Sequence, residues 1–471
     1  MNQRTKITRD QLEQLSKAEL VELVLQLLPR LEKLEDQVAK NSKNSNKPPS
    51  SDGLAKGKPK SLRKKTGRRT GGQKGHKGQT LQMTETPDTV VLHAVLACNH
   101  CGEDLQGVEA VNIAKRQVFD IPPVKMCVEE HQAETKICPT CTKSNQASFP
   151  TDVTQPVQYG KRLLAQVSYL NTYQLLPWQR TCDLIEDFYQ HRPAEGIIGA
   201  ANRRVATHIE PALEMIDQQL QNAPVAHFDE SGLRVGSKLH WLHVASTPLL
   251  TAYHVAVKRG KAGMDEAGIL PAFTGRAIHD HWRSYFGYTC EHGLCNVHHL
   301  RELQFVVDRY QQAWATDMTD LLLDIKQTIA DLPDDQTALC SELQQAYSER
   351  YDQILTAGYA VNPQPERPPR RRGRLRQTPP KNLLDRLRDF KEETVAFMID
   401  LRVPFDNNLA ERDIRMIKVK QKISGAFRTL SGAEIFCAIR SYISTVRKHG
   451  HNVVTEIYQA LSGNLFIPLP E

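Results

Sequence analysis

The sequence has few cysteines, few aromatic residues and no long apolar run. Ten cysteines in 471 residues are too few for a disulfide-stabilised scaffold. No run reaches about 18 apolar residues, so no transmembrane helix is expected. The first residues, MNQRTKITRDQLEQL, contain no apolar core of the kind a secretion signal needs. We therefore expect a protein of the reducing cytoplasm, without a membrane partner.

Basic residues are concentrated in two segments. Residues 41–80 carry twelve Lys and Arg, Arg63 among them, against one acid, Asp52, and residues 367–376 carry six arginines. The net charge of the whole chain is only +7, so the remaining residues are acidic overall. Two basic segments on an acidic body favour a protein that binds nucleic-acid phosphates through flexible arms. Solvated linkers without a ligand are the alternative.

The pattern along the chain predicts a multidomain α/β protein. Leucine and valine recur at a and d spacing within residues 8–40, which predicts a helix that either pairs with a second copy or packs on the body. Pro29 makes two short helices as plausible as one. The predicted parts are a helical or coiled-coil segment (1–40), a flexible basic linker (41–80), a zinc-binding domain (81–155), a helical segment that could bind DNA (156–222), an α/β catalytic domain with a helical insertion at about 300–400 (223–448), and a C-terminal helix and tail (449–471).

Strand-like alternation is strongest after residue 223. Three short runs predict an antiparallel meander, and a helix, a short buried strand and a strand leading into a helix follow. Residues 108–121 and 125–137 also alternate like strands. The later segments are 225–235, 238–247 and 249–257 for the meander, 263–273 for the helix, 275–280 for the buried strand, 293–303 for the strand and helix, and 382–400, 407–422, 431–448 and 452–461 for further helices.

Two CxxC pairs predict a structural zinc site. Cys98 and Cys101 form one pair, and Cys138 and Cys141 form the other. Two thiolates at this spacing can bind one Zn²⁺ from a tight turn, and two such turns complete a closed tetrahedron. Free thiols are the alternative, and Cys127 or His100 could replace one ligand.

Three acidic residues suggest a second, oxygen-rich metal site. Asp229 and Asp280 each end an apolar strand-like run, and Glu411 lies near the start of a predicted helix. Taken singly, each is more simply explained as a turn or helix-cap residue. Together, two strand-end carboxylates and a helical glutamate could hold Mg²⁺, or Mn²⁺, in the arrangement of a two-metal phosphoryl-transfer site.

The predicted helix around Glu411 is rich in polar and basic residues. At helical spacing, some of these residues share the face of Glu411 and others form the neighbouring stripe of the helix. Such a surface would suit a metal–phosphate site. An ordinary surface helix with ion pairs is the alternative. The residues are Asn407 and Arg415 on the same face, Asn408 and Arg412 on the next, and Lys418, Lys420 and Lys422 beyond them.

The segment CEHGLCNVHH offers a further set of ligand types. A second zinc site is conceivable, but Cys290 and Cys295 fall in a stretch that resembles a buried strand, where cysteine acts as a small apolar residue. We favour a position for His298 or Arg301 beside the carboxylates, in contact with DNA phosphate. The segment also contains His292 and His299.

These motifs resemble the insertion-sequence-66 family of bacterial transposases, in its larger, TnpC-type protein. NSKNSNKPPSSD and GGQKGHKG resemble the family's linker, and CNHC with CPTC resembles its zinc-binding domain. The remaining motifs resemble its catalytic domain, in the same order, and the last is the most specific. They are HFDESGLRV, HWLHVAST, IHDHWRSYF, LCNVHHLREL and PFDNNLAERDIRMIKVKQKISGAFR.

The resemblance implies a ribonuclease-H-like fold with a DDE triad at Asp229, Asp280 and Glu411. Cys295, His298 and Arg301 match a family motif after the fifth core strand. The implied activity is cleavage of the ends of a mobile element and their joining to target DNA, by a homo-oligomer associated with the nucleoid. Two small proteins encoded by the same element are candidate partners. A nuclease or resolvase with the same triad, or a non-catalytic zinc-ribbon regulator, is the alternative.

Overall fold

The computed structural model describes residues 9–45, 80–122, 124–333, 336, 338–364 and 377–469. Most of the first predicted basic arm, residues 46–79 with Arg63, and all of 367–376 lie outside these ranges. The described residues belong to two compact units, of which the smaller contains residues 80–129 and 188–190. Within the described ranges, the search for a helix both long and apolar enough to cross a membrane finds none.

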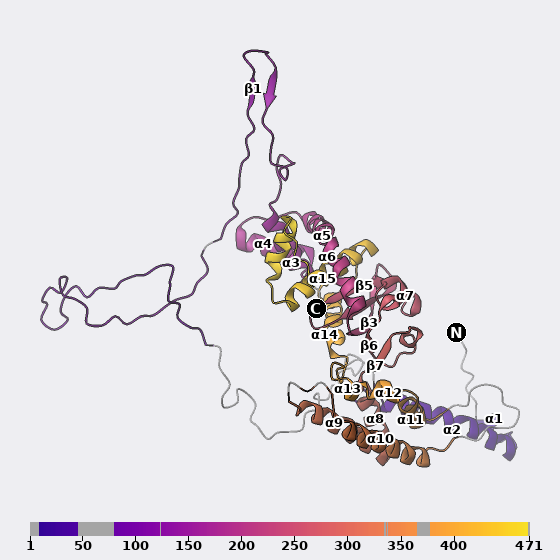
Figure 1. The fold of residues 1–471 in the computed structure, drawn as a ribbon. Helices are drawn as coiled ribbons and strands as arrows, with labels where there is room; N and C mark the ends of the chain where they lie inside the picture. Colours follow the sequence, from indigo (N-terminus) through magenta and orange to yellow (C-terminus); the bar gives the residue numbers. More distant parts are fainter. Residues whose placement is uncertain are drawn as a thin grey trace. The chain divides into compact units, whose positions relative to one another are not determined.

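A five-stranded mixed sheet forms the centre of the larger unit (Figure 1). Its strand order is β5-β4-β3-β6-β7, with β3, β4 and β5 antiparallel and β6 and β7 parallel to β3. Gly236, with φ +57°, supplies the left-handed residue of the two-residue turn between β3 and β4. The predicted α/β class and the predicted meander are confirmed. The strands are β3 (Val225–Val235), β4 (Lys238–Ser246), β5 (Thr251–Ala256), β6 (Arg276–His279) and β7 (Glu291–Leu294).

Helices cover both faces of the sheet. On one face α6 (Glu210–Asn222) and α7 (Lys261–Ala267) share a buried core with Phe228. On the other face α14 (Asn408–Ser424) and α15 (Leu430–Lys448) share a core with Leu233 of the same strand. Successive side chains of a strand point to opposite faces. Odd-numbered residues of β3 therefore point toward α14, and even-numbered ones point toward α7.

A small helical bundle packs beside the sheet. Helix α3 packs on α5 and on α16, and α5 also contacts α15. This agrees with the helices predicted over 156–222, while their DNA-binding role stays a prediction. The bundle helices are α3 (Lys161–Thr172), α4 (Trp178–Tyr189), α5 (Gly196–His208) and α16 (Val453–Leu461).

Among the described residues, six helices lie between β7 and α14. They bury one continuous apolar core, which also contains Ile278 of β6 and Phe405 just before α14. The single helix predicted over 382–400 is instead three short helices with breaks at Phe390 and Val395. The six are α8 (Asn296–Tyr310), α9 (Ala313–Ala330), α10 (Ser341–Val361), α11 (Pro379–Asp389), α12 (Lys391–Thr394) and α13 (Ala396–Ile399).

The N-terminal segment, in which leucine and valine recur at a and d spacing, forms α1 (Arg9–Glu13) and the longer α2 (Lys17–Ala39). Helix α2 continues through Pro29, so a break at that proline does not occur. The break lies before Ser16, whose side chain forms a capping box with Glu19. A capping box stabilises a helix start by pairing otherwise unsatisfied backbone N–H groups, which fixes the boundary there.

The C-terminal end of α2 packs against α8 through polar contacts. Arg309 pairs with Glu35 at 2.6 Å, and the Tyr310 hydroxyl donates to Asp36. The leucine seam itself is not covered in the single chain, since Leu31 and Leu34 are each more than half exposed. Both predicted uses of the helix therefore remain open: its end packs on the body, and its seam stays available.

The region 81–155 contains little regular structure. Its only strands among the described residues are β1 (Thr135–Ile137) and β2 (Ser144–Gln146), which form a hairpin around the second CxxC pair. The prediction of a strand over 108–121 is wrong. Val111 and Val118 there are almost fully exposed, so the alternation buries no apolar face, and no strand in the described part of the chain pairs with it.

Candidate active site

The parallel pairing of β3 and β6 brings two aspartates to one level, Asp229 within β3 and Asp280 directly after β6. The register runs from Val225 opposite Arg276 to His227 opposite Ile278. Two residues further along, Asp229 reaches the level of Asp280, on strands about 4.8 Å apart. The prediction that Asp229 ends its strand is wrong, because β3 continues beyond Asp229 in pairing with β4. The pairing of β3 with β6 ends at His227.

Glu411 lies in the first turn of α14, on the face of the sheet to which Asp229 points. The start of this helix is tied to β3 by Asn407, a buried residue. Its Nδ2 donates to Phe228 O at 2.8 Å, and its Oδ1 hydrogen-bonds His227 Nδ1 at 2.9 Å. Asn407 was predicted to share the face of Glu411, but its side chain anchors the helix to the strand instead. The anchor holds the first turn of α14, which carries Glu411, against β3.

The buried carboxyl of Asp229 lies within reach of the charges of Asp280 and Glu411. Burial raises the pKa of Asp229 well above its usual range, and the charges of Glu230, Asp280 and Glu411 raise it further. Glu411 Oε1 is buried, with no hydrogen-bond partner among the described residues. Such a cluster is relieved by a divalent cation, and hard carboxylate oxygens are the ligands that Mg²⁺ prefers. The residues present therefore fit the predicted Mg²⁺ or Mn²⁺ site.

Glu230, which the sequence analysis did not single out, is held away from this cluster. Its side chain points to the α7 face, where Arg259 donates to Oε1 from Nε at 3.0 Å and Nη2 at 2.7 Å. The Tyr285 hydroxyl donates to Oε2 at 2.5 Å. Arg259 in turn packs over the rings of Trp241 and Trp282. Asp229 and Glu230 are neighbours in HFDES, and the sequence alone does not indicate which of the two carboxylates is paired with such partners.

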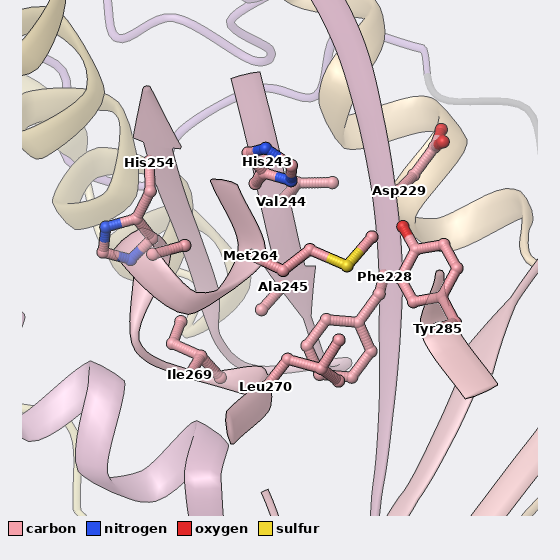
Figure 2. Close-up of a pocket in the computed structure, with 11 residues that line it drawn as sticks. Phe228, Asp229, His243, Val244, Ala245, His254, Met264, Ile269, Leu270 and Tyr285 are labelled. Atoms are coloured by element: carbon pink, nitrogen blue, oxygen red, sulfur yellow. The ribbon is translucent and has the colours of Figure 1, made fainter. Parts of the chain in front are cut away.

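A small pocket lies beside β3, with Asp229 and Tyr285 at its edge (Figure 2). His243 and His254 line it from β4 and β5, and the rest of the lining is largely apolar. Burial lowers the pKa of His243 to about 4, so this ring is neutral at pH 7. The pocket therefore offers little positive charge to a phosphate.

The basic residues predicted along α14 have different environments. Lys420 is buried, donates to Gly425 O at 3.0 Å and lies 3.7 Å from the centre of the Phe427 ring. Burial lowers the pKa of Lys420 to about 8. Lys418 donates to Gly232 O at 2.6 Å. Lys420 therefore holds the end of the helix, whereas Arg412 and Arg415 are exposed.

Comparison with protein families gives three matches along the chain. Residues 156–435 match the family described as transposase IS66, which covers more than half of the sequence. The chain belongs to the IS66 transposase family. Residues 96–142 match the zinc-finger binding domain of transposase IS66, and residues 3–82 match a family of unknown function (DUF6444). Among curated proteins, none matches the chain. Membership in this family of DDE transposases implies phosphoryl transfer in transposition, with DNA and a divalent metal.

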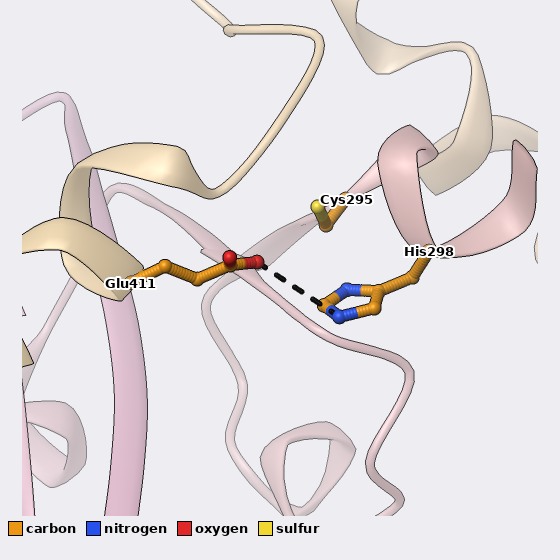
Figure 3. Close-up of side chains that lie close together, drawn as sticks. All are labelled: Cys295, His298 and Glu411. Carbon is orange, nitrogen blue, oxygen red and sulfur yellow. Dashed lines mark ion pairs between the residues drawn. The ribbon is translucent and has the colours of Figure 1, made fainter. Parts of the chain in front are cut away.

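In this transposase, Cys295 and His298 lie beside Glu411 (Figure 3). His298 Nε2 is 3.8 Å from Glu411 Oε1. The pKa of His298 is lowered by burial, although the charge of Glu411 acts in the opposite direction. Burial raises the pKa of the Cys295 thiol to about 12 and that of Cys290 to about 11. Both cysteines are buried, as predicted.

The two CxxC turns have the same local geometry. In the first, Cys98 N donates to Glu103 O and Gly102 N donates to Cys98 O. In the second, Cys138 N donates to Lys143 O and Thr142 N donates to Cys138 O. The fifth residue of each turn has positive φ, +80° at Gly102 and +56° at Thr142. Backbone N–H groups in each turn lower the pKa of its first cysteine, which favours the thiolate that zinc needs. Each pair by itself therefore offers ligands that fit zinc.

We predict one tightly held Zn²⁺ per chain. Elemental analysis of protein purified without added metal should find about one equivalent. Cys98→Ser combined with Cys141→Ser should lose it, and limited proteolysis should then show faster cleavage within 81–155. Cys127→Ser is the matched control, since Cys127 belongs to neither pair, and should keep the ion. Unchanged zinc content in the double variant would refute the assignment.

Proposed function

We propose that this transposase cleaves DNA at the ends of its mobile element and joins them to target DNA. Asp229, Asp280 and Glu411 would form its DDE triad in a ribonuclease-H-like fold. The observation that carries the proposal is the register that aligns Asp229 with Asp280 beneath the first turn of α14. The sheet, with three antiparallel strands followed by two parallel ones, supports the same fold.

In this proposal some side chains bind metal, and others position a helix or the DNA phosphate. The triad would hold two Mg²⁺ ions, which supply Lewis-acid stabilisation of the attacking and leaving oxygens. Asn407 fixes the distance between α14 and β3. His298 lies beside Glu411, and His298 and Arg301 would orient a DNA phosphate. Water would attack the scissile phosphodiester and release a 3′-hydroxyl, which would then attack target DNA in line.

A strand-joining assay tests the function directly. The full-length protein is incubated with labelled element-end DNA, a supercoiled target plasmid and Mg²⁺. Covalently joined end–plasmid products are expected. End cleavage without joined products would indicate a nuclease or resolvase, and binding without cleavage would indicate a regulator. Either result would contradict the proposal.

The predicted basic arm should contribute non-specific DNA affinity. Each phosphate contact contributes a slope of about −0.9 to log affinity against log salt. Replacing residues 41–80 by a Gly/Ser linker of equal length should reduce that slope by several units and leave sequence preference nearly unchanged. Replacing the arginines of 367–376 is expected to reduce joining more than binding. A salt slope equal to that of wild type would show that the first segment is only a spacer.

We also propose the division into parts at residues 40, 80, 155, 222 and 448, and action as a homo-oligomer on nucleoid DNA. The exposed leucine seam of α2 supports self-association. Accessory proteins of the same element remain candidate partners.

A further inference from the structure

Three different ligand types converge beside the candidate active site. Cys295 directly precedes α8, His298 lies in its first turn, and Glu411 lies in the first turn of α14 (Figure 3). One ligand atom from each lies within 4.8 Å of the others. A tetrahedral ion with bonds of about 2.0–2.3 Å separates its ligand atoms by roughly 3.3–3.8 Å. The 3.8 Å between His298 Nε2 and Glu411 Oε1 is already at this spacing.

Two of these side chains have a buried atom without a hydrogen-bond partner. His298 Nδ1 and Glu411 Oε1 find none among the described residues. Buried polar atoms are almost always paired. Glu411 Oε1 is the oxygen that faces His298 Nε2, so its lack of a partner points to a missing ligand between these two side chains. The Cys295 sulfur accepts the backbone N–H of Asn407 at 3.2 Å. Such a bond stabilises negative charge on sulfur, as second-shell donors do in metal sites.

We propose that Cys295, His298 and Glu411 bind a thiophilic divalent ion of the Zn²⁺ class. Sulfur and imidazole ligands select Zn²⁺ over Mg²⁺, which prefers oxygen. On binding, the Cys295 thiol releases its proton to solvent and the thiolate coordinates the ion. Three protein ligands leave one coordination position open, unlike the four cysteines of the CxxC pairs.

The shared glutamate gives this site a regulatory consequence. This consequence rests on the proposed function, in which Glu411 is also a ligand of the catalytic Mg²⁺. Zn²⁺ and Mg²⁺ would compete for this carboxylate. Zn²⁺ at this site therefore withdraws Glu411 from the triad and inhibits strand joining in competition with Mg²⁺.

Binding of Co²⁺, a coloured substitute for Zn²⁺, tests the site without DNA. The full chain, with zinc already in its CxxC pairs, is titrated while the sulfur-to-metal charge-transfer band is recorded. Wild type should bind one further equivalent and show the band. Cys295→Ser should lose the band, and His298→Gln should weaken affinity at least about tenfold. Cys290→Ser, a buried cysteine outside the cluster, is the matched control and should bind as wild type does.

The outcomes separate this inference from the proposed function. No further equivalent in wild type, or a band retained in Cys295→Ser, would overturn the site whatever the joining activity. In the joining assay, added Zn²⁺ should inhibit wild type, and a higher Mg²⁺ concentration should relieve the inhibition. Normal Co²⁺ binding in a protein that never joins strands would contradict the transposition mechanism alone.

Discussion

Asp229→Asn, Asp280→Asn and Glu411→Gln are each expected to abolish cleavage and strand joining, by several orders of magnitude. Each change keeps the shape of the side chain and removes the charge that holds Mg²⁺. Because the three act as one metal site, a double substitution should be little worse than a single one. The measurement is a joining assay beside a gel shift on the same preparations, in which binding of end DNA should persist.

Thermal unfolding without metal provides the folding control for this prediction. An acid whose pKa is raised in the folded state contributes stability below its unfolded pKa and loses it as pH rises through the folded pKa. At neutral pH the Asp229 carboxylate therefore destabilises the metal-free fold. Asp229→Asn should raise Tm by a few degrees and abolish stabilisation by Mg²⁺. If all three variants still joined strands at wild-type rate, the triad would be wrong.

Breaking the ion pair between Asp413 and Lys448 is expected to cost about 3–5 kcal/mol of folding free energy. The two charges are 2.9 Å apart, and each side chain is 15% exposed. Asp413 Oδ2 also accepts from the hydroxyl of Ser246. Lys448 donates to the carbonyls of Thr247 and Leu250. The pair thus fastens α14 and α15 to the β4–β5 hairpin, and Asp413→Asn would leave a buried charge without its partner.

Urea unfolding of Asp413→Asn, Lys448→Met and the double variant measures this coupling. The double variant should be less destabilised than the sum of the single variants. Arg412→Ala, at the exposed neighbouring position, is the control and should change stability little. Since Asp413 is engaged by these partners, Asp413→Asn should retain stabilisation by Mg²⁺. Loss of that response would make Asp413, and not Glu411, the third metal ligand.

Local sequence patterns predicted much of the fold. Alternation and turn residues predicted the meander of β3, β4 and β5, because each strand has one face in a core and a short turn to its neighbour. The same alternation failed over 108–121, because periodicity predicts burial only where a second layer is present to cover it. Likewise, Pro29 did not break α2. The capping box at Ser16 determined where that helix starts.

The site was less predictable than the fold. The residue types at Asp229, Asp280 and Glu411 were visible in sequence, but their alignment depends on the parallel register of β3 and β6, which is a long-range pairing. The neutralisation of Glu230 depends on Arg259 and Tyr285, far away in the chain. No local pattern encodes such contacts, whereas the CxxC turns are encoded locally by their spacing.

The core shared by the helices between β7 and α14 restricts where insertions and deletions can occur in this part of the chain. Ile278 of the sheet is buried in the same cluster as Val297, Leu321, Tyr351 and Leu384 of the inserted helices. A large buried side chain contributes about 1.5–3 kcal/mol, so removing one inserted helix would uncover several such residues at once. Descendants of this sequence should therefore diverge here by volume-conserving substitutions, and insertions and deletions should be tolerated mainly in the connections between helices.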